Sequence, residues 1–232
     1  MRNTKKIYIL HGWSYTTEKW KPFIDLLKRK NIDVVLLNIP GLTAPLDEVW
    51  ELDDYVSWLQ DALRNEKGPV FLLGHSNGGR IALAYLLLYP EKISKLFLID
   101  SAGIYHNELS IRIKRFVFKT VATLGRKMHK SERLRYWLYR LARETDYQKA
   151  NPLIRKTMSN LIAIDLSNSL SQISVKTIII WGEQDKVTPL VDGKLMHEKI
   201  KDSTLFLIKN ARHSPQFTHV QEVADIVIKQ LL

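Results

Sequence analysis

The stretch Gly74-His75-Ser76-Asn77-Gly78-Gly79 follows a strand predicted at Val70 to Leu73 and precedes a helix predicted to begin near Gly79. A serine on a tight turn between strand and helix needs small residues two positions before and after it, because backbone segments approach closely there. Gly74 and Gly78 meet that need. A helix N-terminus also favours negative charge on a nearby bound oxygen. The stretch therefore predicts a nucleophilic serine at position 76.

Outside this turn, short apolar runs alternate with amphipathic segments, which predicts a parallel sheet with helices on both faces. The predicted strands are Lys6 to Leu10, Asp33 to Asn38, Val70 to Leu73, Leu96 to Asp100, Thr177 to Trp181 and Thr204 to Ile208. The predicted helices between them are Thr17 to Lys28, Leu52 to Arg64, Gly78 to Leu88, Asp192 to Lys199 and His219 to Leu231. The fold class is thus α/β, with a six-stranded, mainly parallel sheet.

The long interval between the fourth and fifth strands, residues 104–174, has no strand signal. Apolar residues recur there at spacings of three and four, which predicts a helical insertion with breaks at Gly125 and at Asn151-Pro152. We interpret residues 1–103 and 175–232 as one α/β core and residues 104–174 as a helical lid. No Gly-, Pro- or Ser-rich linker supports a second independent domain.

Composition excludes several kinds of site. The 232 residues include no cysteine, which excludes disulfides, thiol nucleophiles and Cys-ligated metals and fits a reducing cytosol. The seven histidines show no His-Glu-x-x-His spacing, and there is neither a GxGxxG stretch nor a P-loop. The apolar run Ile7 to Leu10 is too short for a membrane span. We expect a soluble, cytoplasmic protein without a metal or another cofactor.

The net charge of +11 is concentrated in the predicted lid. Residues 104–170 carry fourteen basic and five acidic side chains, and the rest of the chain is nearly neutral. Such asymmetry favours an anionic substrate or partner, although solvated helix faces rich in arginine are common. No nucleic-acid-binding module is recognisable. The candidate partner-binding residues are Arg133, Arg135, Arg140 and Arg143.

A serine hydroxyl needs a base, and the base needs an acid that orients it. Two candidates follow predicted strands downstream of Ser76: Asp185, after the fifth strand, and His213, after the sixth. Open α/β sheets bind ligands beyond the carboxyl ends of their strands. The order Ser, Asp, His therefore fits a catalytic triad.

Four pieces in order resemble the α/β-hydrolase family over nearly the whole chain. They are His11-Gly12-Trp13, the glycine-rich turn, Gly182-Glu183-Gln184-Asp185-Lys186-Val187-Thr188-Pro189 and the late His213. The resemblance implies an α/β-hydrolase fold in which Ser76 is the nucleophile, His213 the general base and Asp185 the orienting acid. It also implies an oxyanion hole formed by the backbone N–H groups of Trp13 and Asn77, in a loop shaped by His11 and Gly12.

Competing residues exist for each role. His75 is adjacent to Ser76, but its side chain is expected to point away from that of Ser76. His219 is an alternative base, although it begins the last predicted helix. Asp100 ends the fourth strand and is an alternative acid, whereas Glu183 is expected to form hydrogen bonds within its loop.

The resemblance implies a serine carboxylesterase that cleaves small to medium acyl esters through an acyl-enzyme. The His-Gly-Trp turn is similar to that of compact esterases, including pimeloyl-acyl-carrier-protein methyl ester esterases, in which a basic lid meets an acidic carrier protein. Three alternatives stay open: a lactonase, a C–C bond hydrolase on the same triad, and a binding module or receptor without turnover.

The first strand begins only a few residues from the N-terminus, at Lys6, although similar proteins often place an antiparallel pair of strands before it. We therefore predict a minimal six-stranded sheet whose missing edge leaves the first strand exposed, unless Lys5, Lys6 or a neighbouring subunit shields it.

Overall fold

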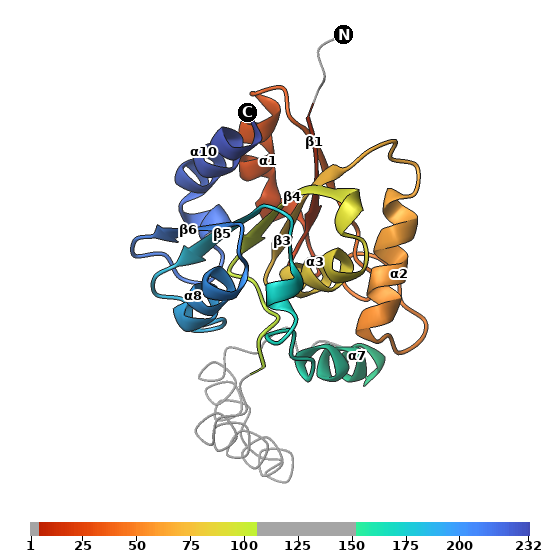
Figure 1. Cartoon of the computed structure of the whole chain (residues 1–232). Coiled ribbons are helices and arrows are strands. Elements are labelled where there is room, and N and C mark those ends of the chain that lie inside the picture. The colour runs from red at the N-terminus through yellow and green to blue at the C-terminus, as the bar shows by residue number, and fades with distance from the viewer. Residues whose placement is uncertain (1–4, 106–151) are drawn as a thin grey trace, which may run out of the picture.

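The computed structural model describes residues 5–105 and 152–232. Six strands form one sheet, and helices cover both of its faces (Figure 1). The strands are β1 (Lys6–Leu10), β2 (Asp33–Leu36), β3 (Val70–His75), β4 (Ile93–Ile99), β5 (Thr177–Gly182) and β6 (Ser203–Ile208).

The spatial order of the strands is β2-β1-β3-β4-β5-β6, and each neighbouring pair is parallel. From β1 the chain first moves outward to β2 and then returns to β3 on the other side. The order therefore reverses between β1 and β3, and such a reversal opens a crevice at the carboxyl ends of the two strands. Ser76 follows β3 and His11-Gly12-Trp13 follows β1, so both segments lie at this point.

The prediction that the first strand lies at an exposed edge is wrong. β1 pairs with β2 on one side and with β3 on the other, and the edges are β2 and β6. The apolar stretch at Ile7–Leu10 is buried on both faces, as a central strand of a parallel sheet requires. A short N-terminus does not expose β1 because β2 supplies the outer edge.

Several strand bounds differ from the prediction, and two carboxyl ends differ by two residues. β3 continues to His75, two residues beyond Leu73, because Gly74 and His75 pair with Leu98 and Ile99 of β4. β2 ends at Leu36 because the chain then turns, and the carbonyl of Ile39 accepts the N–H groups of residues 42, 43 and 44.

Alternate side chains of the strands enter two cores. Tyr8, Leu72 and Leu98 lie in the core beneath α2 (Leu52–Leu63), α3 (Asn77–Leu88) and α8 (Leu190–Lys199). Ile7, Leu73 and Phe97 lie in the opposite core beneath α1 (Lys21–Lys28) and α10 (Val220–Leu231). Figure 1 shows α1 and α10 side by side on that face. The remaining short helices are η1 (Glu18–Trp20), η2 (Pro90–Lys92), η3 (Leu170–Gln172) and α9 (Pro215–Thr218).

The predicted insertion after the fourth strand is described at its two ends. Helix α7 (Pro152–Ile162) begins at the proline of the predicted Asn151-Pro152 break. Its Ile154 and Met158 pack with Trp13 and Leu46, so α7 lies at the carboxyl ends of the strands. Gly125 and the four candidate partner-binding arginines lie outside the described residues.

Among residues 5–105 and 152–232, no helix is long and apolar enough to cross a membrane. The cytoplasmic location stays a prediction.

Candidate active site

Ser76 lies on a sharp turn between β3 and α3. Its φ of 52° and ψ of −120° are unusual for a residue with a side chain. Its N–H donates to the carbonyl of Ile99 at 3.1 Å, and its own carbonyl accepts the N–H groups of Gly79 and Ala102, both at 2.9 Å. These bonds join the turn to β4 and to the segment that follows β4, so the strained backbone is held from two directions.

Glycines allow three backbone segments to meet at this turn. A Cβ atom on Gly78 would lie 2.2 Å from the carbonyl oxygen of Leu10, at the end of β1. A Cβ atom on Gly74 would lie 2.6 Å from the Cα of Gly79. These contacts leave no space for a side chain at either position. The sequence pattern of the turn thus reflects the approach of α3 to β1 and β3.

Gly12 brings the loop after β1 against the turn. A Cβ atom on this residue would lie 2.9 Å from the Cβ of Ser76 and 2.8 Å from Nδ1 of His75. The predicted oxyanion loop is therefore adjacent to Ser76. Among the described residues, the backbone N–H of Trp13 has no hydrogen-bond acceptor.

His11 shapes this loop from a fully buried position. Nδ1 donates to the carbonyl of Gly12 at 2.8 Å, and Nε2 accepts from the hydroxyl of Thr43 at 2.9 Å. Burial lowers the pKa of His11, so the ring is neutral at pH 7. A neutral ring has one donor and one acceptor nitrogen, which is the arrangement these two contacts require.

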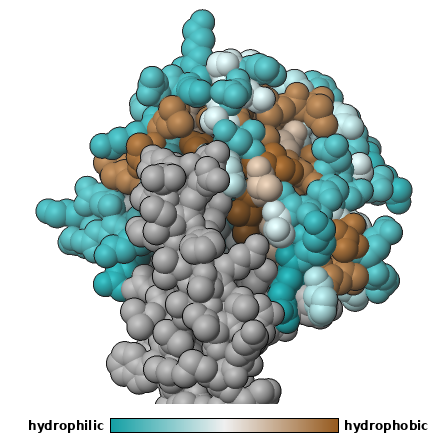
Figure 2. Space-filling model, turned by 90° about the horizontal axis from the view of Figure 1, so that it is seen from below, coloured by the Kyte–Doolittle hydropathy of each residue, from teal (hydrophilic) through white to brown (hydrophobic). Residues whose placement is uncertain are grey.

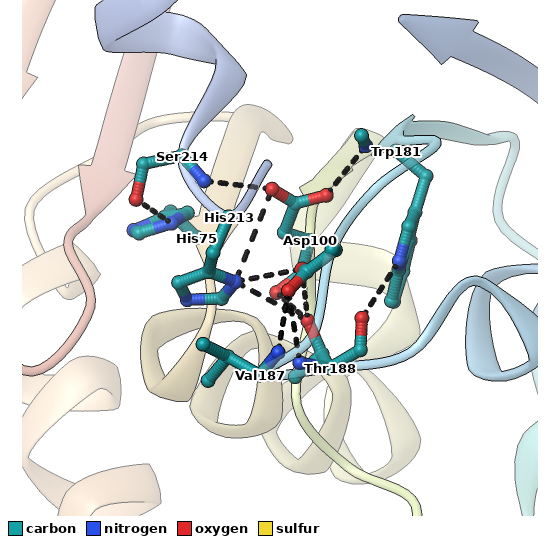
Figure 3. Close-up of polar contacts among 9 residues, drawn as sticks. His75, Asp100, Trp181, Val187, Thr188, His213 and Ser214 are labelled. Carbon is teal, nitrogen blue, oxygen red and sulfur yellow. Dashed lines mark hydrogen bonds and ion pairs between the residues drawn. The ribbon is translucent and has the colours of Figure 1, made fainter. Parts of the chain in front are cut away.

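Asp185 and His213 meet at the carboxyl edge of the sheet. Oδ2 of Asp185 lies 2.7 Å from Nδ1 of His213, and the loops after β5 and β6 carry the two residues. Figure 3 shows Asp100 and Thr188 beside His213. Oδ1 of Asp185 accepts the N–H groups of Val187 at 2.7 Å and Thr188 at 3.2 Å. These backbone bonds fix the orientation of the carboxylate. Because Asp185 engages Nδ1 of His213, Nε2 is the ring nitrogen that can accept a proton.

Asp100 is fully buried beside this pair but has different partners. Its Oδ1 accepts the N–H of Gly182 and its Oδ2 the N–H of Ser214, each at 2.8 Å. Its distance to Nδ1 of His213 is 3.9 Å. Asp100 therefore ties the end of β5 to the loop that carries His213, and Asp185 makes the closer contact with the imidazole.

The pKa of Asp100 is raised to about 7. Burial is the larger cause, and the negative charge of Asp185 is the second. Two carboxylates this close to one imidazole are easier to accommodate when one of them holds a proton.

Thr188 was not singled out from the sequence, although it connects the two acids. Its hydroxyl lies 2.7 Å from Oδ2 of Asp185 and 3.1 Å from the carbonyl oxygen of Asp100. The signal available in the sequence was the Asp-x-x-Thr spacing, since an aspartate often accepts hydrogen bonds from residues two and three positions later.

The alternative residues lie near the site in other roles. His75 is buried, its Nε2 lies 3.1 Å from Oγ of Ser214, and burial holds its pKa well below the usual value. His219 is the N-cap residue of α10, and its Nδ1 lies 2.9 Å from Oγ1 of Thr218. Glu183 is exposed. Within the described ranges, none of these three side chains contacts either Asp185 or Asp100 at hydrogen-bond distance.

Asp100, Asp185 and His213 also form a cluster whose ligand atoms lie within 4.8 Å of one another. The oxygen and nitrogen atoms that a metal would need are already engaged. Asp185 and His213 bind each other, and each oxygen of Asp100 accepts a backbone N–H. The donor set fits a hydrogen-bonded proton-transfer group better than a metal site.

Comparison with known proteins agrees with this architecture. The family model for the α/β hydrolase fold matches residues 5–220. The chain belongs to this family. Its relatives include the monoacylglycerol lipase ABHD6 from Homo sapiens, which is 26% identical over 96% of this chain and 74% of its own length. The pimeloyl-[acyl-carrier protein] methyl ester esterase from Legionella pneumophila is 24% identical over 92% of this chain and 89% of its own length.

A solved α/β hydrolase from a lagoon-sediment metagenome, MGS-MChE2, has the same fold, with a TM-score of 0.72 and 21% identity. The match covers 98% of this chain and 90% of that one. The predicted fold of this α/β hydrolase is thereby confirmed, and the two named relatives are ester hydrolases.

We expect Gly78→Ala to destabilise this hydrolase by about 3 kcal/mol or more, because the new methyl group would meet the backbone of β1. Urea unfolding measures the effect. Gly68→Ala is the matched control, since nothing lies within 4 Å of the added carbon at Gly68, and we expect a change within about 0.5 kcal/mol. Equal stability of the two variants would contradict the close approach of α3 to β1.

The raised pKa of Asp100 predicts a pH dependence of stability. A carboxyl with a pKa of about 7 in the folded state and 3.8 unfolded binds more protons when folded. Its contribution to the unfolding free energy therefore decreases as pH rises from about 4 to 7. We expect this decrease in the native protein, and a flatter profile in Asp100→Asn.

Urea unfolding at several pH values measures both profiles, and substitution of the exposed Asp47 by Asn controls for loss of a surface charge. A difference between native protein and Asp100→Asn that stays constant from pH 4 to 7 would contradict the raised pKa.

Proposed function

We propose that this α/β hydrolase is a serine carboxylesterase in which Ser76, His213 and Asp185 form the catalytic triad. The observation that carries the proposal is the 2.7 Å contact of His213 with Asp185 at the same sheet edge as the strained turn of Ser76. Nδ1 of His213 keeps its proton and donates it in the hydrogen bond to Asp185. Nε2 therefore accepts the proton of the Ser76 hydroxyl as that oxygen attacks the ester carbonyl.

The negative charge that develops on the carbonyl oxygen needs N–H donors. Asn77 is the first residue of α3, where N–H groups have no acceptor within the helix, and the loop that carries Trp13 is packed against Ser76 through Gly12. We assign the two backbone N–H groups to the oxyanion hole. One such donor contributes roughly a 10²- to 10³-fold rate increase.

The reaction then proceeds in two steps. Collapse of the tetrahedral intermediate breaks the ester C–O bond, and His213 donates its proton to the departing alkoxide. Water then attacks the acyl-enzyme, with His213 as the base, and releases the acid and Ser76.

An apolar acyl group suits the surroundings of the site. Figure 2 views the edge at which α7 lies, where hydrophobic surface gathers among hydrophilic residues. Tyr15, Val187 and Val191 are exposed apolar residues on segments that follow β1 and β5. We propose esters of small to medium acids as substrates, in keeping with the ester-hydrolase names of the two relatives. The acidic carrier protein stays a prediction, because Arg133, Arg135, Arg140 and Arg143 lie outside the described residues.

We expect Ser76→Ala to abolish hydrolysis of p-nitrophenyl esters and labelling by a fluorophosphonate, because the reacting oxygen is removed. Ser94→Ala is the control, since Ser94 is exposed at the start of β4 and we expect it to keep full activity. Equal labelling of native protein and Ser76→Ala would refute the proposed nucleophile. Labelling of Ser76 without turnover of any ester would favour the C–C bond hydrolase or lactonase alternative.

Substitution of the two acids separates their roles. We expect Asp185→Asn to lower kcat by about 10³- to 10⁴-fold, because an asparagine cannot stabilise the His213 imidazolium. Asp100→Asn leaves the contact between Asp185 and His213 in place, and we expect a loss within about tenfold. Steady-state kinetics on one ester compares them. A larger loss in Asp100→Asn than in Asp185→Asn would transfer the role of the acid to Asp100.

A further inference from the structure

Arg80 is the one charged residue of α3, whose other residues are apolar or neutral. It lies in the first turns of the helix, four residues after Ser76, and only 5% of its surface is exposed. Burial lowers the pKa of Arg80 to about 10, which still leaves the guanidinium protonated at neutral pH. A buried positive charge therefore lies beside the proposed nucleophile.

This charge has no acidic partner among the described residues. Nη1 donates to the side-chain oxygen of Asn77 at 3.0 Å. Nε is buried and has no hydrogen-bond partner within residues 5–105 and 152–232. A buried charge without a counter-ion costs several kcal/mol of folding free energy, so proteins seldom keep one for packing alone. Nε of the guanidinium is therefore a donor that no group in the described parts of the chain uses.

The side chain leans toward the end of α3 that holds Ser76. Gly78 and Gly79 pack against Leu10 and Ser101, so they mark the face of α3 that contacts the strand ends. Successive residues turn by about 100°, which places Asn77 and Arg80 on the opposite face. Helical side chains point back toward the N-terminus, in keeping with the bond from Arg80 to Asn77. A four-residue step is about 6 Å along the axis, so Arg80 lies about one helical turn from Ser76, and its guanidinium is hydrogen-bonded to the residue that follows Ser76.

Two further N–H donors in the same segments lack acceptors. They are Nε1 of Trp13, in the loop packed on Ser76 through Gly12, and Nδ2 of Asn77. Of the five buried side-chain atoms without a partner in the described parts of the chain, these two and Nε of Arg80 belong to α3 or to the loop packed on Ser76 through Gly12. The other two atoms belong to Gln216. Nε1 of Trp13, Nδ2 of Asn77 and Nε of Arg80 are all hydrogen-bond donors. A group with several acceptor oxygens would satisfy them.

We infer that Arg80 binds a carboxylate on the substrate and that the esters cleaved at Ser76 carry a free acid group, as half-esters of dicarboxylic acids do. A carboxylate has two acceptor oxygens in one plane, which match the donors on one edge of a guanidinium. The side chains of Asn77 and Trp13 add neutral donors beside it. This inference rests on the proposed esterase function and names the substrate class.

The main test compares charged and neutral esters of equal length. The probes are monomethyl esters of dicarboxylic acids from succinate to suberate, each paired with a methyl ester whose chain ends in a methyl group. We expect the native protein to prefer the charged member of the best pair by about 10- to 100-fold in kcat/KM, and Arg80→Met to lose this preference. Arg80→Lys keeps the positive charge but lacks the planar guanidinium that can donate two parallel hydrogen bonds. We expect this variant to retain part of the preference for the charged ester. Arg64→Met, at an exposed arginine, is the matched control.

Stability distinguishes a binding role from a structural one. A methionine fills similar volume without a buried charge, so we expect Arg80→Met to be at least as stable as the native protein in urea unfolding. A purely structural arginine would instead make Arg80→Met less stable and leave the substrate preference unchanged, which would overturn the inference.

A binding measurement separates failure of the inference from failure of the esterase proposal. In Ser76→Ala, we expect free glutarate or adipate to raise Tm, neutral diols of the same length to have no effect, and Arg80→Met to remove the response. Neutral esters cleaved as well as charged ones, without a Tm response to the dicarboxylates, would overturn the inference and leave the esterase proposal intact. A Tm response without hydrolysis of any ester would refute the esterase proposal and support carboxylate binding at Arg80.

Discussion

Ser76 adopts a left-handed backbone because its N–H and its carbonyl are bound to Ile99 and Ala102 while Gly12, Gly74 and Gly78 allow neighbouring backbones to touch it. Such a conformation costs about 1–3 kcal/mol and persists only where its surroundings hold it. Here the surroundings are the ends of β1, β3 and β4, which meet at the reversal in strand order. The position of the proposed nucleophile therefore depends on the parallel register of the central strands and not on the turn alone.

The two acids near His213 divide a task that a single carboxylate would perform less well. Asp185 binds the imidazole, and backbone N–H groups and Thr188 fix its own orientation. Asp100 holds the loops after β5 and β6 together through Gly182 and Ser214. The burial that makes Asp100 effective as a brace also raises its pKa to about 7. Loop geometry and proton affinity are therefore coupled in this part of the site.

The triad candidates could be predicted because their chemistry depends on residue type and order. Glycines around Ser76, and an aspartate and a histidine after later strands, leave few alternatives once six strands are placed. Asp100 and Asp185 both follow strands, so sequence order favoured one without excluding the other, and distances of 2.7 Å and 3.9 Å to His213 separate them. Thr188 lies in one of the four segments that resemble the family but was given no role of its own, and Arg80 lies in none of them. An arginine within an apolar helix was the available signal for Arg80.

The alternation of apolar and amphipathic segments was enough to determine the α/β class, the number of strands and the serine turn, because hydrophobic periodicity and glycine sterics act over a few neighbouring residues. The order of the strands was not accessible in this way, and the first strand was wrongly placed at an edge. The packed sheet and helices bring together the residues that pair β1 with β2 and that join His213 to Asp185. They also bury Arg80 away from every acidic side chain among the described residues. Burial and distance, which set pKa values and hydrogen-bond partners, exist only after that packing is complete.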